Sequence, residues 1–438
     1  MPQNVPQKSF GGLKTLNYDI LVNCIHCGLC LPQCPTYALT GNERSSPRGR
    51  IRLMKSVADG DLNLSDVFVD EMDFCLDCQA CETACPAGVK YGELVETARV
   101  QIHEAGREPW FRRMSKTILL GWVFMRRPRL HALASILRFV DRSGIPSALR
   151  KSGLLGLISH RLKALESLTP KMSPRPSSDI LASVLPPLGP RRYRVGFLTG
   201  CIMDVAFADI NIDTVELLRH HGCEVVIPPA QECCGSLHGH NGDRRTALKL
   251  ARANIEAFDD ETLDYVVMNS SGCGAFMKDY GHFFADDPDL AVKAGRVSKK
   301  TKDITEFLQE TGFSPSPKPV DRFSGRKVTY HDACHLVHTQ KISAQPRELI
   351  RSVPGIDFVE LPESTWCCGS AGIYNVVRYD DSMKLLDRKM QHIRSITPEI
   401  LVTGNPGCMI QIQHGLRQEG RHVELMHTAT FLRHACGI

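Results

Sequence analysis

Two runs of closely spaced cysteines, each ending in proline, constrain this chain more than any other feature. The run "CIHCGLCLPQCP" begins at Cys24, and "CLDCQACETACP" begins at Cys75. Both have the spacing C-x2-C-x2-C-x3-C-P, and each cysteine of the first run recurs 51 positions later in the second. A constant offset across a whole set of residues indicates a duplicated structural unit.

The sequence contains 18 cysteines in 438 residues. The first residues, "MPQNVPQKSFGGLK", hold no apolar stretch of the kind that a secretory signal needs. Without such a signal an oxidising compartment is not expected, so metal binding or redox chemistry accounts for the cysteines better than disulfides do. No run of about 18 apolar residues occurs, which argues against a membrane-spanning helix.

The spacing of both runs is the one that ligates cubane iron–sulfur clusters. Three cysteines wrap one cluster on a tight loop, and the fourth, which precedes Pro35 or Pro86, reaches the other cluster. Two [4Fe–4S] clusters are therefore predicted. The ligands would be Cys24, Cys27, Cys30 and Cys85 for the first cluster and Cys75, Cys78, Cys81 and Cys34 for the second. A pair of structural zinc sites is the alternative, because C-x2-C units also bind zinc.

A second duplication involves adjacent cysteines followed by glycine and serine. The stretch "ECCGSLHGHNG" begins at Glu232, and "WCCGSAGIYN" begins at Trp366. Two further cysteines recur with each pair, again at a near-constant offset. The two sets are Cys201, Cys233, Cys234 and Cys273, and Cys334, Cys367, Cys368 and Cys408. We call each set with its surrounding residues a CCG unit.

The C-terminal half alternates between short apolar, β-branched runs and helical stretches, which is typical of parallel α/β units. Six such runs are each followed within a few residues by one of the repeated cysteine motifs. They are "YRVGFLTG", "CEVVIPPA", "DYVVMNS", "RKVTYHD", "IDFVELPE" and "EILVTGN". Because the carboxyl ends of parallel strands meet at one edge of a sheet, the thiols should gather there. The pattern predicts either two clefts of four thiols each or one shared cleft.

The predicted fold class is α+β: an N-terminal α-helical ferredoxin-type domain, then a duplicated α/β, parallel-sheet, Rossmann-like CCG region. A basic, amphipathic, helical stretch follows the second cysteine run, and a Pro- and Ser-rich segment follows that. The expected boundaries are 1–168 for the helical domain with its extension, 169–192 for the linker, 193–320 for the first CCG domain and 321–438 for the second.

Three interpretations of the CCG thiols remain open. They could form vicinal disulfides or stay as buried thiols, which leaves the co-repeating Cys201, Cys334, Cys273 and Cys408 unexplained. They could bind zinc, for which four thiols in each half suffice. They could hold one or two further iron–sulfur clusters, which the eight cluster-type cysteines upstream make the favoured interpretation. Gly235 and Gly369 would let the backbone approach the bound group closely.

The CCG units resemble the cysteine-rich domains of heterodisulfide reductase, anaerobic glycerol-3-phosphate dehydrogenase, lactate-utilisation proteins and glycolate oxidase. The order of two cluster motifs and two CCG units is similar to that of glycolate oxidase iron–sulfur subunits. The stretches that carry the resemblance are "CIHCGLCLPQCPTY", "SPRGRIRLMK", "SGCGAFMKDYG" and "CCGSAGIYN".

This resemblance implies an electron-transfer subunit of an oxidoreductase that converts glycolate to glyoxylate. Flavoprotein partners would carry FAD and the substrate site, and a quinone or another acceptor would receive the electrons. The chain itself would have no catalytic residue, and none of its sequence matches a nucleotide-binding G-x-G-x-x-G motif after a strand. Alternatives are a subunit of a related lactate or glycerol-3-phosphate dehydrogenase, or a thiol–disulfide redox protein.

The chain departs from the disulfide-reducing relatives at one point of each unit. Their CCG unit ends in C-x-x-C, whereas the last position here is Phe276 in "CGAF" and Gln411 in "CMIQ". A histidine could supply a missing ligand. The histidines next to the motifs are His238, His240, His331, His335 and His338.

Charge and hydropathy bear on whether the chain binds nucleic acid or a membrane. The net charge of +5 is mild and the basic residues form no long runs, which argues against nucleic acid. The segment from Trp110 to Leu137 has apolar and Arg-rich faces, as a helix at a membrane interface does, although a core helix explains it equally well. The resemblance to glycolate oxidase subunits, which are membrane-associated, implies a location in the cytoplasm, peripheral on the cytoplasmic face of the inner membrane.

Overall fold

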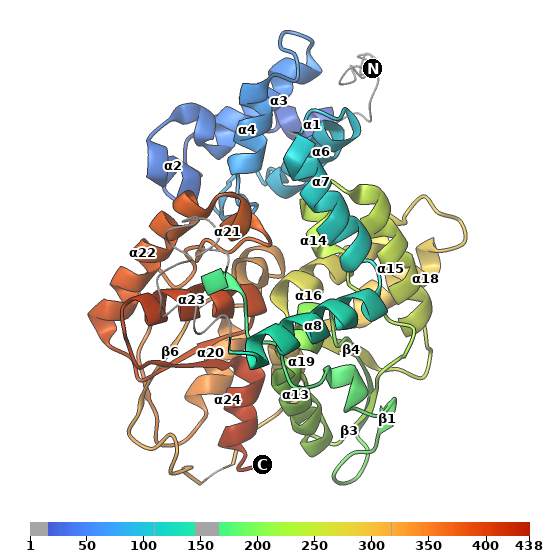
Figure 1. The fold of residues 1–438 in the computed structure, drawn as a ribbon, viewed down its shortest axis with the longest axis vertical. Coiled ribbons are helices and arrows are strands. Elements are labelled where there is room, and N and C mark those ends of the chain that lie inside the picture. The colour runs from blue at the N-terminus through green and yellow to red at the C-terminus, as the bar shows by residue number, and fades with distance from the viewer. Residues whose placement is uncertain (1–15, 109, 145–165, 317) are drawn as a thin grey trace.

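The computed structural model describes residues 16–108, 110–144, 166–316 and 318–438. A cap of helices sits on two α/β units that lie side by side (Figure 1). The cap holds α1 (Tyr18–Val22), α2 (Pro35–Thr40), η1 (Glu43–Ser45), α3 (Pro47–Ala58), α4 (Asp66–Phe74), α5 (Ala80–Thr83) and α6 (Tyr91–Glu104). The chain then leaves the cap through α7 (Trp110–Ile118), the π-helix η2 (Leu119–Val123) and α8 (Arg127–Arg142).

The first α/β unit is a five-stranded sheet in the order β1-β3-β2-β4-β5. All pairs are parallel except that of β1 with β3. Its strands are β1 (Val184–Leu185), β2 (Tyr193–Phe197), β3 (Cys223–Val226), β4 (Tyr265–Met268) and β5 (Thr301–Asp303). Its helices are η3 (Ser177–Asp179), α12 (Ile202–Ala206), α13 (Ala208–His220), α14 (Ser236–His240), α15 (Arg244–Phe258), α16 (Ser271–Lys278), α17 (Tyr280–Phe283), α18 (Ala291–Lys300) and α19 (Ile304–Glu310).

The second α/β unit is a fully parallel four-stranded sheet in the order β7-β6-β8-β9. Its strands are β6 (Lys327–Tyr330), β7 (Asp357–Phe358), β8 (Ile400–Thr403) and β9 (Glu424–His427). Its helices are the π-helix η4 (His335–Thr339), α20 (Ala344–Arg351), α21 (Tyr374–Val377), α22 (Tyr379–Ile396), α23 (Pro406–Gln418) and α24 (Thr428–Ala435).

The predicted fold class is confirmed. Each of the six predicted runs forms a strand, and these six strands carry the cysteine motifs at their carboxyl ends. Three other short strands had no clear signal in the sequence. They are β1, inside the Pro-rich segment, and the edge strands β5 and β9. The Pro-rich segment is thus an extended strap that adds an edge strand to the first sheet.

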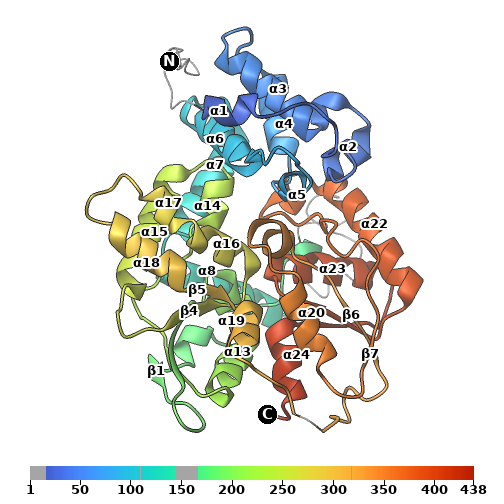
Figure 2. The ribbon, with the colours of Figure 1, turned by 180° about the vertical axis from the view of Figure 1, so that it is seen from behind.

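The two α/β units share one hydrophobic core, which contains Phe197 and Val225 of the first sheet and Tyr330 and Val402 of the second. Helices α13 and α24 pack against each other between the sheets, as Figure 2 shows from the back. The cap has its own core, built around Met54, Leu94 and other apolar side chains. The halves of the duplicated region are therefore held as one body.

Candidate metal centres

The first cysteine run is an open loop between α1 and α2. His26 has φ 55° and Gly28 has φ 87°, which are left-handed conformations that reverse the chain tightly enough for three cysteines to converge. Cys27 is exposed. A small surface cavity brings the first predicted ligand set together, since Cys24, Cys27, Cys30 and Cys85 all line it.

The second cysteine run repeats this conformation. The corresponding residues Asp77 and Gln79 have φ values of 54° and 59°. Cys75, Cys78 and Cys81 are all buried, in contrast to the first loop. Burial raises the pKa of the Cys81 thiol, and the neighbouring thiols raise it further. These neighbours are Cys78, Cys75 and Cys34, so the four members of the second predicted ligand set lie close enough to interact electrostatically.

Polar groups surround the second set. Tyr91 Oη donates a hydrogen bond to Cys75 Sγ at 3.5 Å, and the Asp77 amide donates to the same sulfur at 3.4 Å. The Arg50 guanidinium is fully buried next to Cys75 and Cys34 and hydrogen-bonds to Thr36 Oγ1 at 3.0 Å. A buried cation and hydrogen-bond donors both favour thiolate over thiol. Free cysteine thiols in this number and setting fit an iron–sulfur cluster.

The first CCG unit gathers its thiols at the carboxyl ends of β2, β3 and β4. Cys201 lies before α12, the vicinal pair follows β3, and Cys273 is in the first turn of α16. Cys233 Sγ lies 3.5 Å from Cys201 Sγ. Interactions with the thiols of Cys201 and Cys234, and with His238, hold the pKa of Cys233 well below its usual range. Cys234 interacts with both Cys233 and Cys273, so the four thiols form one connected group.

The second CCG unit has the same arrangement. Cys334 pairs with Cys367, and Cys368 interacts with Cys367 and Cys408. Glycine is required after each vicinal pair. Gly235 and Gly369 have φ values of 93° and 90°, and a Cβ would lie 2.9 Å from the carbonyl oxygen of Ala247 or 2.7 Å from that of Ser382.

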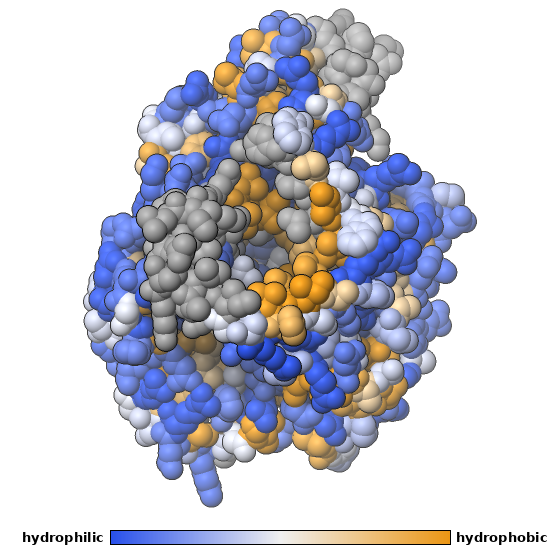
Figure 3. Space-filling model, in the orientation of Figure 1, coloured by the Kyte–Doolittle hydropathy of each residue, from blue (hydrophilic) through white to orange (hydrophobic). Residues whose placement is uncertain are grey.

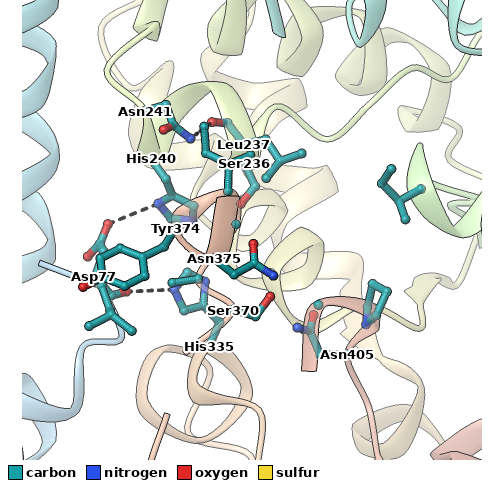
Figure 4. A pocket seen from close by; sticks show the side chains of 18 of the residues that line it. Asp77, Ser236, Leu237, His240, Asn241, His335, Ser370, Tyr374, Asn375 and Asn405 are labelled. Carbon is teal, nitrogen blue, oxygen red and sulfur yellow. Dashed lines mark hydrogen bonds and ion pairs between the residues drawn. The ribbon is translucent and has the colours of Figure 1, made fainter. Parts of the chain in front are cut away.

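One cavity of about 340 Å³ lies between the two CCG units. Of the two arrangements predicted from the sequence, this is the single shared cleft. All eight CCG cysteines line it. In the space-filling view a hollow opens at the centre of the face, bordered by hydrophobic side chains (Figure 3). Ser370, Tyr374, Asn375 and Asn405 also border the cavity (Figure 4).

A partly buried ionic cluster joins the three parts of the chain. Asp77, in the second cysteine loop, meets His240 Nδ1 at 3.3 Å, and His240 also meets Glu96 Oε1 at 2.7 Å. His335 Nε2 donates to the Asp77 carbonyl at 2.9 Å (Figure 4). The charges of Glu96 and Asp77 outweigh burial and raise the pKa of His240 to about 10. No local sequence pattern indicated this cluster, because its members are far apart in the chain.

The second cysteine loop also packs directly on the second CCG unit. Cys78, Leu76 and Cys367 belong to one buried cluster, and Cys334 packs against it. Gln79 accepts a hydrogen bond from Thr339 at 2.8 Å across the same junction. The second ferredoxin-type site is therefore next to the second CCG site.

Phe276 and Gln411, which stand where the disulfide-reducing relatives have the last cysteine of C-x-x-C, make other contacts in this structure. The Phe276 ring packs onto Gly235 and Gly239. Gln411 is buried, accepting from Asn375 at 3.1 Å and donating to Ser382 at 2.8 Å.

The candidate histidines differ in their partners. His238 Nε2 donates to the Leu120 carbonyl at 2.9 Å, and His338 Nδ1 contacts Thr83 Oγ1 at 3.1 Å. His240 and His335 belong to the Asp77 cluster. His331 is the exception among the five, because neither of its ring nitrogens makes a hydrogen bond of normal geometry in the described structure.

Family models match most of the chain. A 4Fe-4S dicluster domain matches residues 20–89, and a cysteine-rich CCG domain matches residues 195–278 and 328–413. The linker region of glycolate oxidase iron-sulfur subunits matches residues 108–169.

Curated relatives agree with these matches. The probable glycolate oxidase iron-sulfur subunit of Bacillus subtilis is 40% identical, over 95% of this chain and 94% of the relative. The glycolate oxidase iron-sulfur subunit of Escherichia coli is 32% identical, over 94% of each. Lactate utilization protein A of Oceanobacillus iheyensis is 36% identical, over 55% of this chain and 96% of its own length. The chain therefore belongs to the family of glycolate oxidase iron–sulfur subunits, components of oxidoreductase complexes.

Proposed function

We propose that this chain relays electrons within a glycolate oxidase, from a flavin on a partner subunit to a quinone-type acceptor. Two relatives that match nearly the whole chain carry the glycolate oxidase name, and so does the linker-region model at residues 108–169. The chain carries no dinucleotide-binding glycine motif, so FAD and glycolate oxidation to glyoxylate are assigned to the partner subunits.

Two [4Fe–4S] clusters are the proposed carriers, and such clusters pass one electron at a time whereas alcohol oxidation releases two. The proposed ligands are Cys24, Cys27, Cys30 and Cys85 for one cluster and Cys75, Cys78, Cys81 and Cys34 for the other. The grouping of each set supports this crossed assignment. We also propose that the domains and the linker end at residues 168, 192 and 320, as expected from the sequence.

The proposed electron relay rests mainly on the spatial order of the cysteine sites. The first ferredoxin-type site opens to the surface at Cys27, and the second is buried. The second abuts the second CCG unit through Cys78 and Cys367. A line of neighbouring sulfur sites leading inward from the surface suits one-electron transfer, and the CCG thiols extend that line into the shared cavity.

The entry face for electrons is proposed to surround Cys27. Val22, Ile25 and Leu29 expose 49%, 67% and 58% of their surface there. Exposed apolar side chains gathered around a functional group mark a protein interface. The proposed occupant is the flavoprotein partner, because its flavin must come close to the first cluster.

Replacing Ile25 and Leu29 by Glu tests this face. Two buried apolar contacts at an interface centre typically contribute enough that affinity falls roughly tenfold or more. Co-purification with the partner, quantified by pull-down, measures the loss. The matched control is Leu188→Glu, at a site 54% exposed in the Pro-rich strap. Equal binding by both variants would remove the entry face from the proposal.

The acceptor side is proposed to touch the cytoplasmic face of the inner membrane. No helix within the described residues is long and apolar enough to cross a bilayer. The segment α7–η2–α8 buries one face, with Leu130 and Ala134 packed beside Val205. Its other face exposes apolar side chains together with arginines, as interfacial helices do. The exposed apolar residues are Trp110, Met114, Ile118, Trp122, Ile136 and Phe139.

Substrate assays on the purified complex test the assignment. We expect the flavoprotein that co-purifies with this chain to oxidise glycolate and to reduce a soluble quinone analogue. Turnover of lactate without glycolate would contradict the glycolate assignment and favour the second candidate, a lactate-utilisation complex, which the similarity to lactate utilization protein A supports. Turnover of glycerol 3-phosphate alone would contradict both.

A further inference from the structure

His331 is buried at the carboxyl end of β6 with no conventional partner. The residue is 1% exposed. Neither Nδ1 nor Nε2 makes a hydrogen bond of normal geometry, although the ring lies close enough to the Ser364 backbone to interact with it. One of these nitrogens lies within 4.8 Å of both Cys368 Sγ and Cys408 Sγ. Burying a polar group without a partner costs roughly 1–3 kcal/mol, so a buried imidazole beside two thiols requires an explanation.

The first CCG unit has no counterpart of this histidine. The offset that relates Cys201 to Cys334 also relates Leu198 to His331. The backbone confirms the equivalence: the Leu198 amide donates to the Val267 carbonyl at 3.1 Å, and the His331 amide donates to that of Val402 at 2.9 Å. The two units thus differ at one structurally equivalent, sulfur-facing position.

A second difference lies on the helix behind the cysteines. Lys389 of α22 is fully buried and donates to the carbonyls of Glu363 and Ser364 at 2.5 and 3.2 Å. The corresponding residue of α15 is the neutral Asn254, which donates to the Cys233 carbonyl at 2.9 Å. Burial lowers the pKa of Lys389 to about 8, and the nearby thiols of Cys368 and Cys367 act against this by favouring the charged amine. A buried cation at this place offsets negative charge on a metal–thiolate centre.

We propose that His331 is a metal ligand of the second CCG unit, acting with Cys334, Cys367, Cys368 and Cys408. Gln411 stands where the disulfide-reducing relatives have their last cysteine, and His331 supplies a fifth donor from a different strand end. The first unit, with Leu198 and Phe276, keeps sulfur donors alone. This inference deepens the proposed function, on which it rests for the presence of a metal.

The chemistry of the ligand set suits iron in a cluster, and it also suits zinc. Imidazole is neutral where thiolate is negative, and histidine in place of cysteine raises the reduction potential of an iron–sulfur centre. Together with Lys389, this makes the second unit the better electron acceptor of the two. The second unit is also the one that Cys78 contacts.

Pulsed EPR on anaerobically purified full-length chain, labelled with ¹⁵N-histidine, tests the ligand. We expect a directly bound nitrogen coupling in the parent protein. The coupling should disappear in His331→Leu, which copies the first unit, while the signals of the two ferredoxin-type clusters are unchanged. If the site holds iron, absence of the coupling in the parent, or its survival in His331→Leu, would overturn the proposal.

His331→Cys is the control for a folding defect, because it keeps an atom that can bind the metal. It should retain the metal content of the parent and lose the nitrogen coupling. If metal analysis finds zinc instead of extra iron, X-ray absorption replaces EPR, with a Zn–N shell at roughly 2.0–2.1 Å expected in the parent and absent in both variants.

A paired Cys367→Ser, Cys368→Ser variant separates this inference from the proposed function. A metal content equal to that of the parent would mean that the second unit binds no metal, which overturns the role of His331. The relay proposal would fail separately, if the ferredoxin-type clusters of the parent complex stayed oxidised in the presence of glycolate.

Discussion

At the scale of single residues, the CCG units are defined by what lies around the sulfurs. Phe276 and Gln411 occupy the positions where C-x-x-C would place a cysteine, and both are locked by packing or hydrogen bonds. The glycine after each vicinal pair is required by its left-handed backbone and by the helix that passes close to it. The geometry of the thiols therefore depends on residues that carry no reactive group.

Gly369→Ala tests this dependence. A left-handed conformation alone costs a non-glycine residue roughly 1–2 kcal/mol. The new methyl group would also meet the Ser382 carbonyl oxygen at 2.7 Å, and such overpacking adds roughly 1–3 kcal/mol. We expect a lower thermal unfolding midpoint, measured anaerobically by circular dichroism.

Gly420→Ala is the matched control, because Gly420 has φ 60° and no atom lies within 4 Å of the place that a new methyl group would take. It should show the conformational cost without the clash. Equal shifts for the two variants would mean that the close approach at Gly369 has no energetic consequence.

At the scale of elements, the segment α7–η2–α8 has two different faces. Its buried face packs on the first α/β unit, where His131 Nε2 meets Asp204 Oδ2 at 2.8 Å. Its outer face exposes Trp122 by 57% and Phe139 by 75%, and Arg129 stacks over the Trp122 ring. The sequence was compatible with a core helix and with an interfacial helix, and the structure gives the segment one face suited to each.

Replacing Trp122 and Phe139 by Ser tests the outer face. Transfer of each aromatic ring into the lipid interface contributes roughly 1.5–3 kcal/mol, so their joint loss should weaken binding at least roughly tenfold. Co-sedimentation with vesicles that contain anionic lipid gives the binding constant. Val292→Ser, on α18 and 69% exposed, is the control and should bind like the parent. Unchanged binding by the double variant would exclude this segment as the membrane contact.

Local patterns predicted the elements well but not their junctions. The cysteine spacings and six apolar runs were sufficient for the helical cap, the parallel strands and the duplication. The strands β1, β5 and β9 were missed because each is short and lies at a sheet edge. The Asp77 cluster joins residues from three parts of the chain, so no periodicity reports it. His331 could have been singled out by aligning the repeats, where Leu198 takes its place.

At the scale of the whole molecule, Asp77 is where the cap and both α/β units meet. Its carboxylate faces His240 of the first unit, and its carbonyl accepts from His335 of the second. Arg99 of α6 donates to the His240 carbonyl at 3.0 Å and to the Met72 carbonyl at 3.0 Å. Charge pairing at this buried point therefore helps to hold the second cysteine loop against the shared cavity.

His240→Gln tests the charge pairing through its pH dependence. In the folded protein Glu96 and Asp77 raise the pKa of His240 from 6.5 to about 10, against the opposing effect of burial. A raised pKa in the folded state means that the stabilisation is complete below pH 6.5 and is lost as the pH rises towards 10. The parent should therefore unfold at a higher temperature than His240→Gln near pH 6, and the gap should close towards pH 10.

His422→Gln, at an exposed position, is the control and should follow the parent at every pH. A gap between parent and His240→Gln that is constant with pH would mean that the histidine contributes packing and not charge.

The central claim is that electrons from glycolate enter this chain through its ferredoxin-type sites. Its most direct test is low-temperature EPR of the anaerobic complex after glycolate is added without an acceptor. The account predicts that signals of reduced [4Fe–4S] clusters appear and disappear again when a quinone analogue is added. A complex whose flavin is reduced by glycolate while every cluster stays oxidised would contradict it.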